Sequence, residues 1–174
     1  MSTRSTISIH KLDGKIDTIY CHYDGYYEHN GVILYNFYNT PEKVKELIAH
    51  GDLSCLGTEI GKKHDFDKRG YYACTFYRRD RGEENYLRIY DSYEDIDSEE
   101  YNYIFVEETQ EWLVSRWNYN QYKKLEDVFR IISLKEWMIV VSNEEQYQKM
   151  INFYKKFGSS DMKILKFEDV SYEI

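Results

Sequence analysis

The sequence predicts an α+β fold with a largely antiparallel sheet. Segments in which apolar and polar residues alternate, the pattern typical of strands, occur in groups along the chain. Helical spacing of apolar residues is concentrated near 32–50 and near 143–157. Grouped strands with few helices between them favour an α+β arrangement over a parallel sheet flanked by regularly alternating helices.

An N-terminal β-hairpin is the first predicted element. Strands are predicted at 6–11 and 15–22, and Asp13 and Gly14 stand between them. This dipeptide favours the tight turn that joins antiparallel strands, because both residues tolerate positive φ. The following segment, 23–31, is rich in turn-forming residues and is predicted to be an irregular loop.

Helices are predicted next, at 32–38 and 41–50. Thr40 and Pro41 have the positions of an N-cap and a first helical residue, where proline is well tolerated. Gly51 stands where a left-handed residue commonly ends a helix.

The middle of the chain is predicted to form further strands. Those at 71–78 and 85–90 would be joined by a charged turn at 79–84, and strands at 101–106 and 111–117 would follow. In the last third, Ser142 and Glu145 have the spacing of a capping box, with Ser142 as the N-cap of the helix near 143–157. The other elements predicted there are a helix at 125–132 and strands at 137–141 and 162–167.

Composition indicates one globular domain over 1–174. A chain of 174 residues with 42% hydrophobic and 31% charged residues is long enough to bury a core without disulfides or structural metal. Its three cysteines are odd in number and lack metal-ligand spacing, so they predict buried thiols in a reducing compartment. No metal and no cofactor is expected.

Charge and targeting signals narrow the class of partner. The formal net charge of -8 disfavours direct binding to a nucleic-acid backbone and suits a protein partner with a basic face. The alternative is that the charge only keeps the protein soluble. The N-terminus lacks the apolar region of a signal peptide, and no apolar run approaches the ~20 residues that span a bilayer. We therefore expect a cytoplasmic protein with no membrane contact.

Tyrosine is unusually abundant, with 19 residues in the chain. Its ring buries apolar area while its hydroxyl still hydrogen-bonds, which suits binding surfaces. The alternative is that tyrosine replaces phenylalanine at the edges of the core. The tyrosines beside polar loops are the predicted binding residues: Tyr23, Tyr26, Tyr27, Tyr90 and Tyr93.

Two short polar clusters are candidates for chemistry. His64, Asp65 and Asp67 lie together in a charged loop, and His22 and Asp24 share one face at the end of a strand. Carboxylates with imidazole could perform acid–base catalysis or hold a divalent metal. Solvated loop residues are the alternative, since no known ligand spacing is matched.

Charged segments supply the remaining candidates. Arg79 and Arg81 could bind a phosphate or carboxylate, or could pair with acidic neighbours in a hairpin turn. The acidic stretch 91–100 could imitate a phosphate backbone and enter a basic groove, or could be a solvated loop. Its candidate binding residues are Glu94, Asp95, Asp97, Glu99 and Glu100.

Several of these segments together resemble an uncharacterised family of short proteins encoded by phages, prophages and other mobile elements. The similarity extends from the N-terminus to about Trp117 and leaves 118–174 unmatched. The segments that carry it include TRSTI at 3–7, IYCHYDGY at 19–26, HDFD at 64–67, RDRGE at 79–83 and EYNYIF at 100–105. The resemblance implies an accessory gene in a bacterial host cell, a setting in which small acidic proteins often inhibit host defence, as anti-CRISPR proteins do.

Two functions from different classes follow. The first is a binding protein that inhibits a host defence complex, such as an RNA-guided nuclease, through an acidic, tyrosine-rich surface. The second is a small enzyme that acts on nucleic acid or a nucleotide through metal or acid–base chemistry. A regulatory interaction domain without an inhibitory role is a third hypothesis. Convergence of the loops at 22–31 and 62–70 would favour an active or ligand-binding site.

Overall fold

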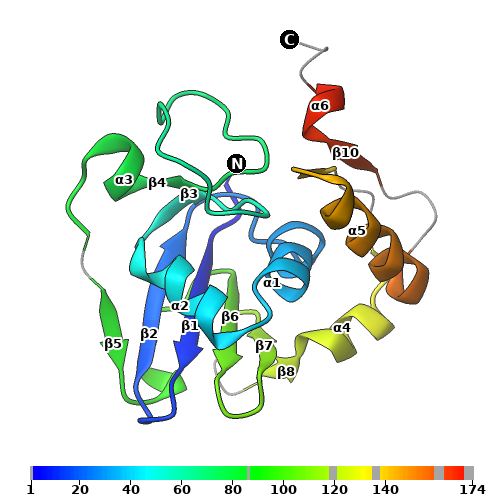
Figure 1. Ribbon diagram of the computed structural model, residues 1–174. Helices are drawn as coiled ribbons and strands as arrows, with labels where there is room; N and C mark the ends of the chain where they lie inside the picture. Colours follow the sequence, from blue (N-terminus) through cyan, green and yellow to red (C-terminus); the bar gives the residue numbers. More distant parts are fainter. Residues whose placement is uncertain (1, 86, 118–120, 135–137, 159–162, 171–174) are drawn as a thin grey trace.

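The structure, a computed structural model, describes residues 2–85, 87–117, 121–134, 138–158 and 163–170. Helices cover one face of a largely antiparallel sheet that starts with an N-terminal hairpin, which confirms the predicted α+β class (Figure 1). Within the described ranges, no helix combines the length and the apolar character needed to cross a membrane.

The main sheet has the strand order β4-β3-β2-β1-β6-β7-β8, and β5 pairs with β2 beside β3. Strand β1 lies between an antiparallel neighbour, β2, and a parallel neighbour, β6. The bounds are Ser5–His10 (β1), Ile16–Cys21 (β2), Leu53–Cys55 (β3), Thr75–Phe76 (β4), Arg88–Tyr90 (β5), Tyr101–Val106 (β6), Glu111–Ser115 (β7) and Lys123–Lys124 (β8).

The hairpin β1–β2 is confirmed in the predicted place. Gly14 has a φ of 87°, and its N–H donates to the carbonyl of Lys11 at 2.9 Å. Ile7 and Ile9 are buried on the face of β1 that meets the helices. The turn chemistry and the alternation of apolar residues thus agree with the observed register.

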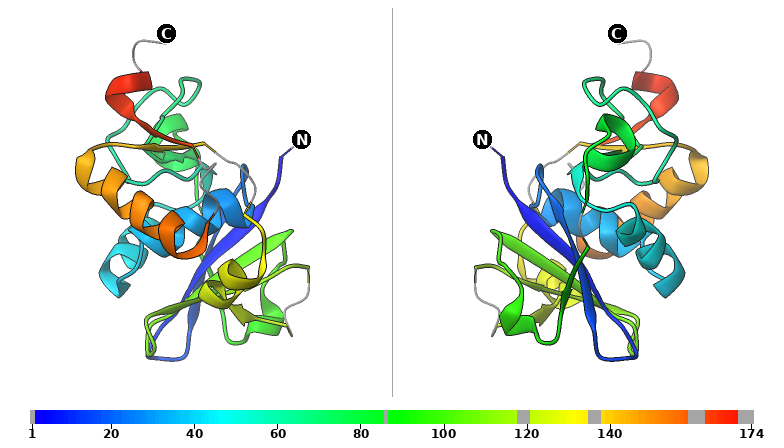
Figure 2. Two further views of the ribbon diagram at one scale, coloured as in Figure 1. Left: turned by 90° about the vertical axis from the view of Figure 1, so that its right-hand side faces the viewer. Right: turned by 90° about the vertical axis from the view of Figure 1, so that its left-hand side faces the viewer.

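Helices pack on this face around one continuous core (Figure 2). Residues from the C-terminal part, including Phe129, Met150 and Phe153, belong to the same core cluster as Val32 and Phe105. Helix α4 packs against β7 and helix α5 against α1, so the last third of the chain shares the core of the N-terminal part. The helices are Val32–Phe37 (α1), Pro41–Ala49 (α2), Leu125–Ile131 (α4) and Glu144–Phe157 (α5).

The N-cap of α2 is the predicted residue, whereas the N-cap of α5 differs from the prediction by one residue. Thr40 caps α2, because its Oγ1 accepts from the N–H of Lys43 at 3.3 Å. Asn143, and not the predicted Ser142, caps α5, because its Oδ1 accepts from the N–H of Gln146 at 2.9 Å. Asparagine is at least as good an N-cap as serine, so the helix starts one residue later than the capping box predicts.

The opposite face of the sheet is covered by the acidic segment 91–100. Ile96 is buried there with Ile16 and Ile104, and Tyr90 and Tyr93 pack against them. Tyr93 belongs to a one-turn 3₁₀ helix, Tyr93–Asp95 (η2), which directly precedes Ile96. The segment is therefore an ordered cover on the sheet, with its charges outside and its apolar residues inside.

The predicted hairpin around 79–84 is wrong. Only Thr75–Phe76 of the segment 71–78 is a strand, and the chain then forms a helix, α3, over Tyr77–Arg81. The physical reason is the carboxylate of Asp80, which accepts from the N–H of Phe76 at 2.7 Å and fixes the start of the helical turn. Gly82 ends α3 with a φ of 72°, and β5 pairs with β2 instead of β4.

The C-terminal strands form a separate two-stranded parallel sheet. Its strands are Ile139–Val141 (β9) and Ile164–Lys166 (β10), followed by a short helix, Phe167–Val170 (α6). The predicted strands at 137–141 and 162–167 are therefore present in shorter form, while Trp137 and Met162 lie outside the described residues.

Candidate functional site

A cleft of about 830 Å³ lies where the loops at 22–31 and 62–70 meet. Tyr23, Asp24 and His29 line it from the first loop, and residues 66–71 line it from the second. Met138, Val140 and Lys163 of the C-terminal part also contribute to its lining. The two polar loops, about 40 residues apart in the chain, thus converge on one site.

The first wall begins where β2 ends. The N–H groups of His22 and Tyr23 donate to the carbonyls of Leu53 and Ser54 at 3.0 and 3.1 Å, which extends the pairing of β2 with β3. Asp24 then takes a left-handed φ of 59°. Non-glycine residues adopt this conformation at a cost, and such positions are concentrated at functional sites.

Asn30 holds this wall from behind. It is fully buried, and its Nδ2 donates to the carbonyl of Tyr23 at 3.3 Å and to Ser5 Oγ at 3.1 Å. Because a carbonyl only accepts, Oδ1 is the atom that faces His29 Nδ1 at 2.8 Å. His29 Nδ1 therefore carries a proton and donates it to Asn30.

His29 sits in a π-helical turn, Tyr27–Gly31 (η1), that continues directly into α1. Single π-turns are frequent at functional sites. Burial lowers the pKa of His29, although the nearby Asp24 carboxylate and the bond to Asn30 act in the opposite direction. The imidazole is therefore neutral at pH 7 and serves as a hydrogen-bonding group of the cleft.

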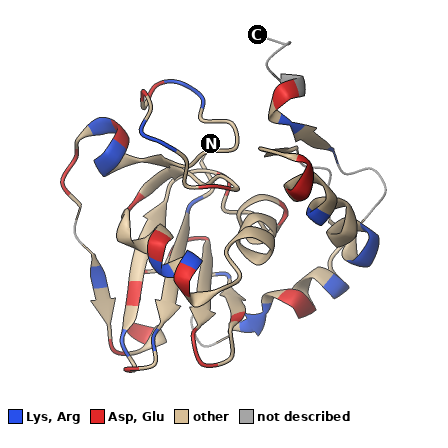
Figure 3. Cartoon of the chain, viewed as in Figure 1, with Lys and Arg blue, Asp and Glu red and all other residues tan. Residues whose placement is uncertain are grey.

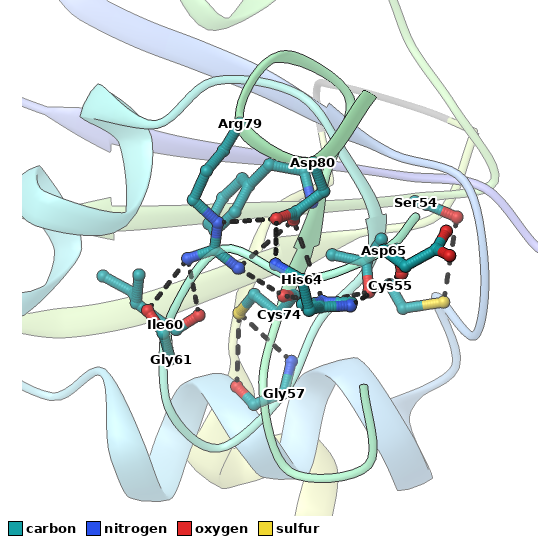
Figure 4. A network of polar contacts seen from close by, with 12 residues as sticks. Ser54, Cys55, Gly57, Ile60, Gly61, His64, Asp65, Cys74, Arg79 and Asp80 are labelled. Carbon is teal, nitrogen blue, oxygen red and sulfur yellow. Dashed lines mark hydrogen bonds and ion pairs between the residues drawn. The ribbon is translucent and has the colours of Figure 1, made fainter. Parts of the chain in front are cut away.

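The second wall is held by Arg79 and Asp80 (Figure 4). The Asp80 carboxylate has no exposed surface and accepts from the N–H of His64 at 3.0 Å. Burial acts to raise the pKa of Asp80, but the Arg79 side chain and the N–H groups of Phe76 and His64 outweigh it and lower the pKa. The carboxylate is thus ionised and ties the start of the loop to α3.

Arg79 donates every N–H of its guanidinium to this network. Two donors reach Asp80, and the others reach the carbonyls of Ile60, Gly61 and Cys74 at 2.9–3.0 Å. Arg79 therefore closes the base of the loop. The predicted phosphate-binding role is not available to a guanidinium whose donors are all used within the protein.

The fold brings only part of the two predicted acid–base clusters to the cleft. Asp24 and Asp67 line the cleft, whereas His22, His64 and Asp65 do not. His64 Nε2 lies 3.2 Å from both the Cys74 carbonyl and Thr75 Oγ1, and His22 Nδ1 bonds to the Tyr20 hydroxyl at 2.7 Å. Among the residues that the structure describes, no three His, Cys, Asp or Glu side chains form a group that could hold a metal ion. The described residues therefore do not form the metal site that was considered as one alternative for these clusters.

The thiols of this region are protonated at neutral pH. Cys55 lines the cleft, and burial raises its pKa above the usual value of 9.0. Burial also raises the pKa of Cys74 to about 11, and Cys21 is shifted in the same direction. Because the thiolate is the nucleophile, these environments favour hydrogen bonding over nucleophilic attack.

Most of the predicted binding tyrosines are used inside the fold. The rings of Tyr26 and Tyr27 pack against Tyr101, and the Tyr93 hydroxyl bonds to His10 Nδ1 at 2.8 Å. Tyr90 packs on the small core below the acidic segment. Tyr23, which is 44% exposed, remains at the cleft.

The acidic candidates lie on the outer side of their segment. Glu94, Asp95 and Asp97 are exposed, and Glu100 contacts Arg116 at 3.5 Å. Glu99 is held through its backbone, whose carbonyl accepts from Asn102 Nδ2 at 2.9 Å. Arg81, like these carboxylates, is at the surface, where it pairs with Glu83 and covers the ring of Phe66.

Some cleft residues were not singled out by sequence reasoning, notably His29, Cys55, Lys68 and Arg69. The charged run 62–69 was a visible signal, but its spacing did not separate the residues that line the cleft from those that do not. Comparison of the chain with family models, curated proteins and solved structures finds no match. The resemblance to mobile-element proteins therefore stays a prediction.

Proposed function

We propose that the protein is a binding protein that holds a small polar organic molecule in the cleft between the loops at 22–31 and 62–70. The observation that carries this proposal is the convergence of the two loops on one cavity. Its volume of about 830 Å³ lies within the ~300–1,000 Å³ of typical small-molecule sites. Apolar side chains such as Ile33 and Leu56 and several charged groups share its lining, as is usual for such sites.

Both walls are fixed before any ligand arrives. Buried Asn30 braces the first wall, and the Arg79–Asp80 network braces the second. Preformed walls reduce the ordering cost of binding and so favour affinity. Protonated thiols and a neutral His29 offer hydrogen bonds without an activated nucleophile, so binding is favoured over covalent catalysis.

A thermal-shift screen of nucleotides, sugars and amino acids tests the proposal. A compound present at 100 times its Kd stabilises the folded state by about 2.7 kcal/mol, which corresponds to a rise in Tm of about 5–11 °C for a chain of this size. Val140→Trp, which fills the cleft from β9, should abolish the rise. Leu113→Trp, at an equally half-buried position on β7 away from the cleft, is the control. A screen without hits, or hits unaffected by Val140→Trp, would contradict the proposal.

A second candidate is the inhibition of a host defence complex through the acidic segment 91–100. Supporting it, Glu94, Asp95 and Asp97 are exposed while Ile96 is buried beneath them. Such carboxylates would meet a basic groove with little further ordering, since their backbone is already fixed. Tyr90 and Tyr93 pack on the sheet, so the interaction would depend on charge and not on stacked rings.

Charge reversal tests this second candidate. Glu94→Lys combined with Asp95→Lys should release a captured RNA-guided nuclease or restriction complex in a pull-down and restore its activity. Glu42→Lys combined with Glu46→Lys on α2 makes the same change of net charge away from the segment. Equal loss of binding in both double variants, or no binding by the unmodified protein, rejects the candidate.

A further inference from the structure

We propose that the ligand of the cleft carries a phosphate group at one end and hydroxyl groups at the other, as a nucleotide does. The proposal rests on the proposed small-molecule function and assigns the chemistry of the ligand. Lys68 and Arg69 would bind the phosphate, and Asp24 with neutral His29 would bind the hydroxyl groups. Apolar floor residues between them would contact the base.

The proposed phosphate-binding end of the cleft contains two cationic side chains without acidic partners. Within the described part of the chain, neither Lys68 nor Arg69 forms an ion pair with a carboxylate. Both side chains are exposed and line the cleft, so they are available to an anionic group of a ligand there.

The position of these cations agrees with a phosphate site. Figure 3 shows Lys and Arg gathered in the loop above the sheet, which is the loop that forms the second wall. The Arg69 guanidinium lies 5.3 Å from the centre of the Tyr71 ring, whose own backbone has a left-handed φ of 56°. This stacking orients the guanidinium beside the cleft, where its planar donors match phosphate oxygens.

The two charged ends act on the same interior group. The positive charge of Arg69 lowers the pKa of the Cys55 thiol and the negative charge of Asp24 raises it. Asp24, Cys55 and Arg69 also line the cleft together. A ligand with an anionic group near Arg69 and hydrogen-bond donors near Asp24 matches this polarity, and a ribose diol is a donor pair that carboxylates bind well.

The lining of the cleft supplies apolar surface for a base. Leu56 and Val140 are apolar parts of the lining. Apolar lining of this kind contacts a ligand without selecting it through hydrogen bonds. The lining thus favours nucleotides as a class without selecting one base.

Isothermal titration calorimetry with AMP, GMP, CMP and UMP, with the corresponding nucleosides and with inorganic phosphate, tests the proposal. At least one nucleotide should bind the unmodified protein more tightly than its nucleoside. Arg69→Gln with Lys68→Gln should weaken nucleotide binding by about 10- to 100-fold and leave nucleoside binding unchanged. Lys62→Gln, in the same loop but outside the cleft lining, should have no effect.

Asp24→Asn tests the other end, because asparagine also tolerates the left-handed backbone at this position. It should weaken nucleotide and nucleoside to the same degree and should not affect binding of the 2′-deoxy forms as strongly. If other compounds bind in the cleft but nucleotides bind no tighter than nucleosides, the phosphate assignment is wrong and the small-molecule function stands. If no compound binds in a way that Val140→Trp abolishes, both proposals fail.

Discussion

The carboxylate of Asp80 accepts a hydrogen bond of 3.0 Å from the backbone N–H of His64, and this contact fixes the loop that forms one wall of the cleft (Figure 4). The same carboxylate pairs with Arg79, whose other donors close the base of the loop on Ile60 and Gly61. A helix of five residues, α3, thereby positions a wall of the cleft that begins 16 residues earlier in the chain.

Asp80→Ala should destabilise the protein by about 3–5 kcal/mol, because it leaves a buried arginine and two backbone donors without their partner. Urea denaturation followed by circular dichroism measures the loss. Glu83→Ala removes the half-exposed partner of Arg81 and should cost less than about 1 kcal/mol. Comparable losses in the two variants would show that the Asp80 network does not hold the loop.

The contribution of Asp80 should depend on pH. Its pKa is lowered in the folded state relative to an unfolded value of about 3.9, so the stabilisation is complete above about pH 4. It should decline as the pH falls through the lower folded-state pKa. The difference in unfolding free energy between the unmodified protein and Asp80→Asn should therefore shrink between pH 4 and pH 2. A difference in unfolding free energy that grows on acidification would contradict a lowered pKa of Asp80 in the folded state.

Asn30→Ala should weaken ligand binding in the cleft although Asn30 does not line it. The substitution removes the donor to the Tyr23 carbonyl and the acceptor for His29, and leaves buried polar groups unsatisfied at a cost of about 1–3 kcal/mol each. Calorimetry and thermal unfolding measure the two effects. Asn36→Ala is the control, since this side chain is also buried but donates to the carbonyl of Val32 within its own helix, α1. A binding loss of the same size in both variants would contradict a specific role for Asn30.

Cys55 should react slowly with iodoacetamide at pH 7 and progressively faster as the pH rises past 9, because burial raises the pKa of its thiol. Peptide mass spectrometry after timed labelling measures the rate, and a bound cleft ligand should slow it. Cys74 provides an internal comparison, since it is fully buried and should stay unlabelled in the folded protein. Rapid labelling of Cys55 at pH 7 would indicate an activated thiol and would favour covalent catalysis over simple binding.

Elements with local chemical signals were predictable from the sequence. The Asp13–Gly14 turn and the Thr40 cap each depend on residues within a few positions of one another, and both are found where predicted. Helix α3 was missed although the bond from the Phe76 N–H to Asp80 that starts it is local. The contact of Asp80 with the N–H of His64, which ties α3 to the loop at 62–70, spans 16 residues and has no local signal. The local charge pattern of 79–84 suited a hairpin equally well.

The site was only partly predictable for a related reason. Asp24 and Asp67 were singled out by residue type, and the fold brings both to the cleft. His29 was not singled out because its place in the cleft depends on the loop at 66–71, which is distant in sequence. His64, conversely, matched a catalytic pattern, yet its ring contacts the backbone carbonyl of Cys74 and so has a structural role.

The central claim is that the cleft between the loops at 22–31 and 62–70 is the functional site. Two-dimensional ¹H–¹⁵N NMR, recorded while the strongest compound of the thermal-shift screen is titrated, tests it most directly. The account predicts chemical-shift changes at the amides of Asp24, His29 and Gly70, and unchanged amides in β7 and in the segment 91–100. Changes centred on the segment 91–100, or an absence of changes at the cleft, would contradict it.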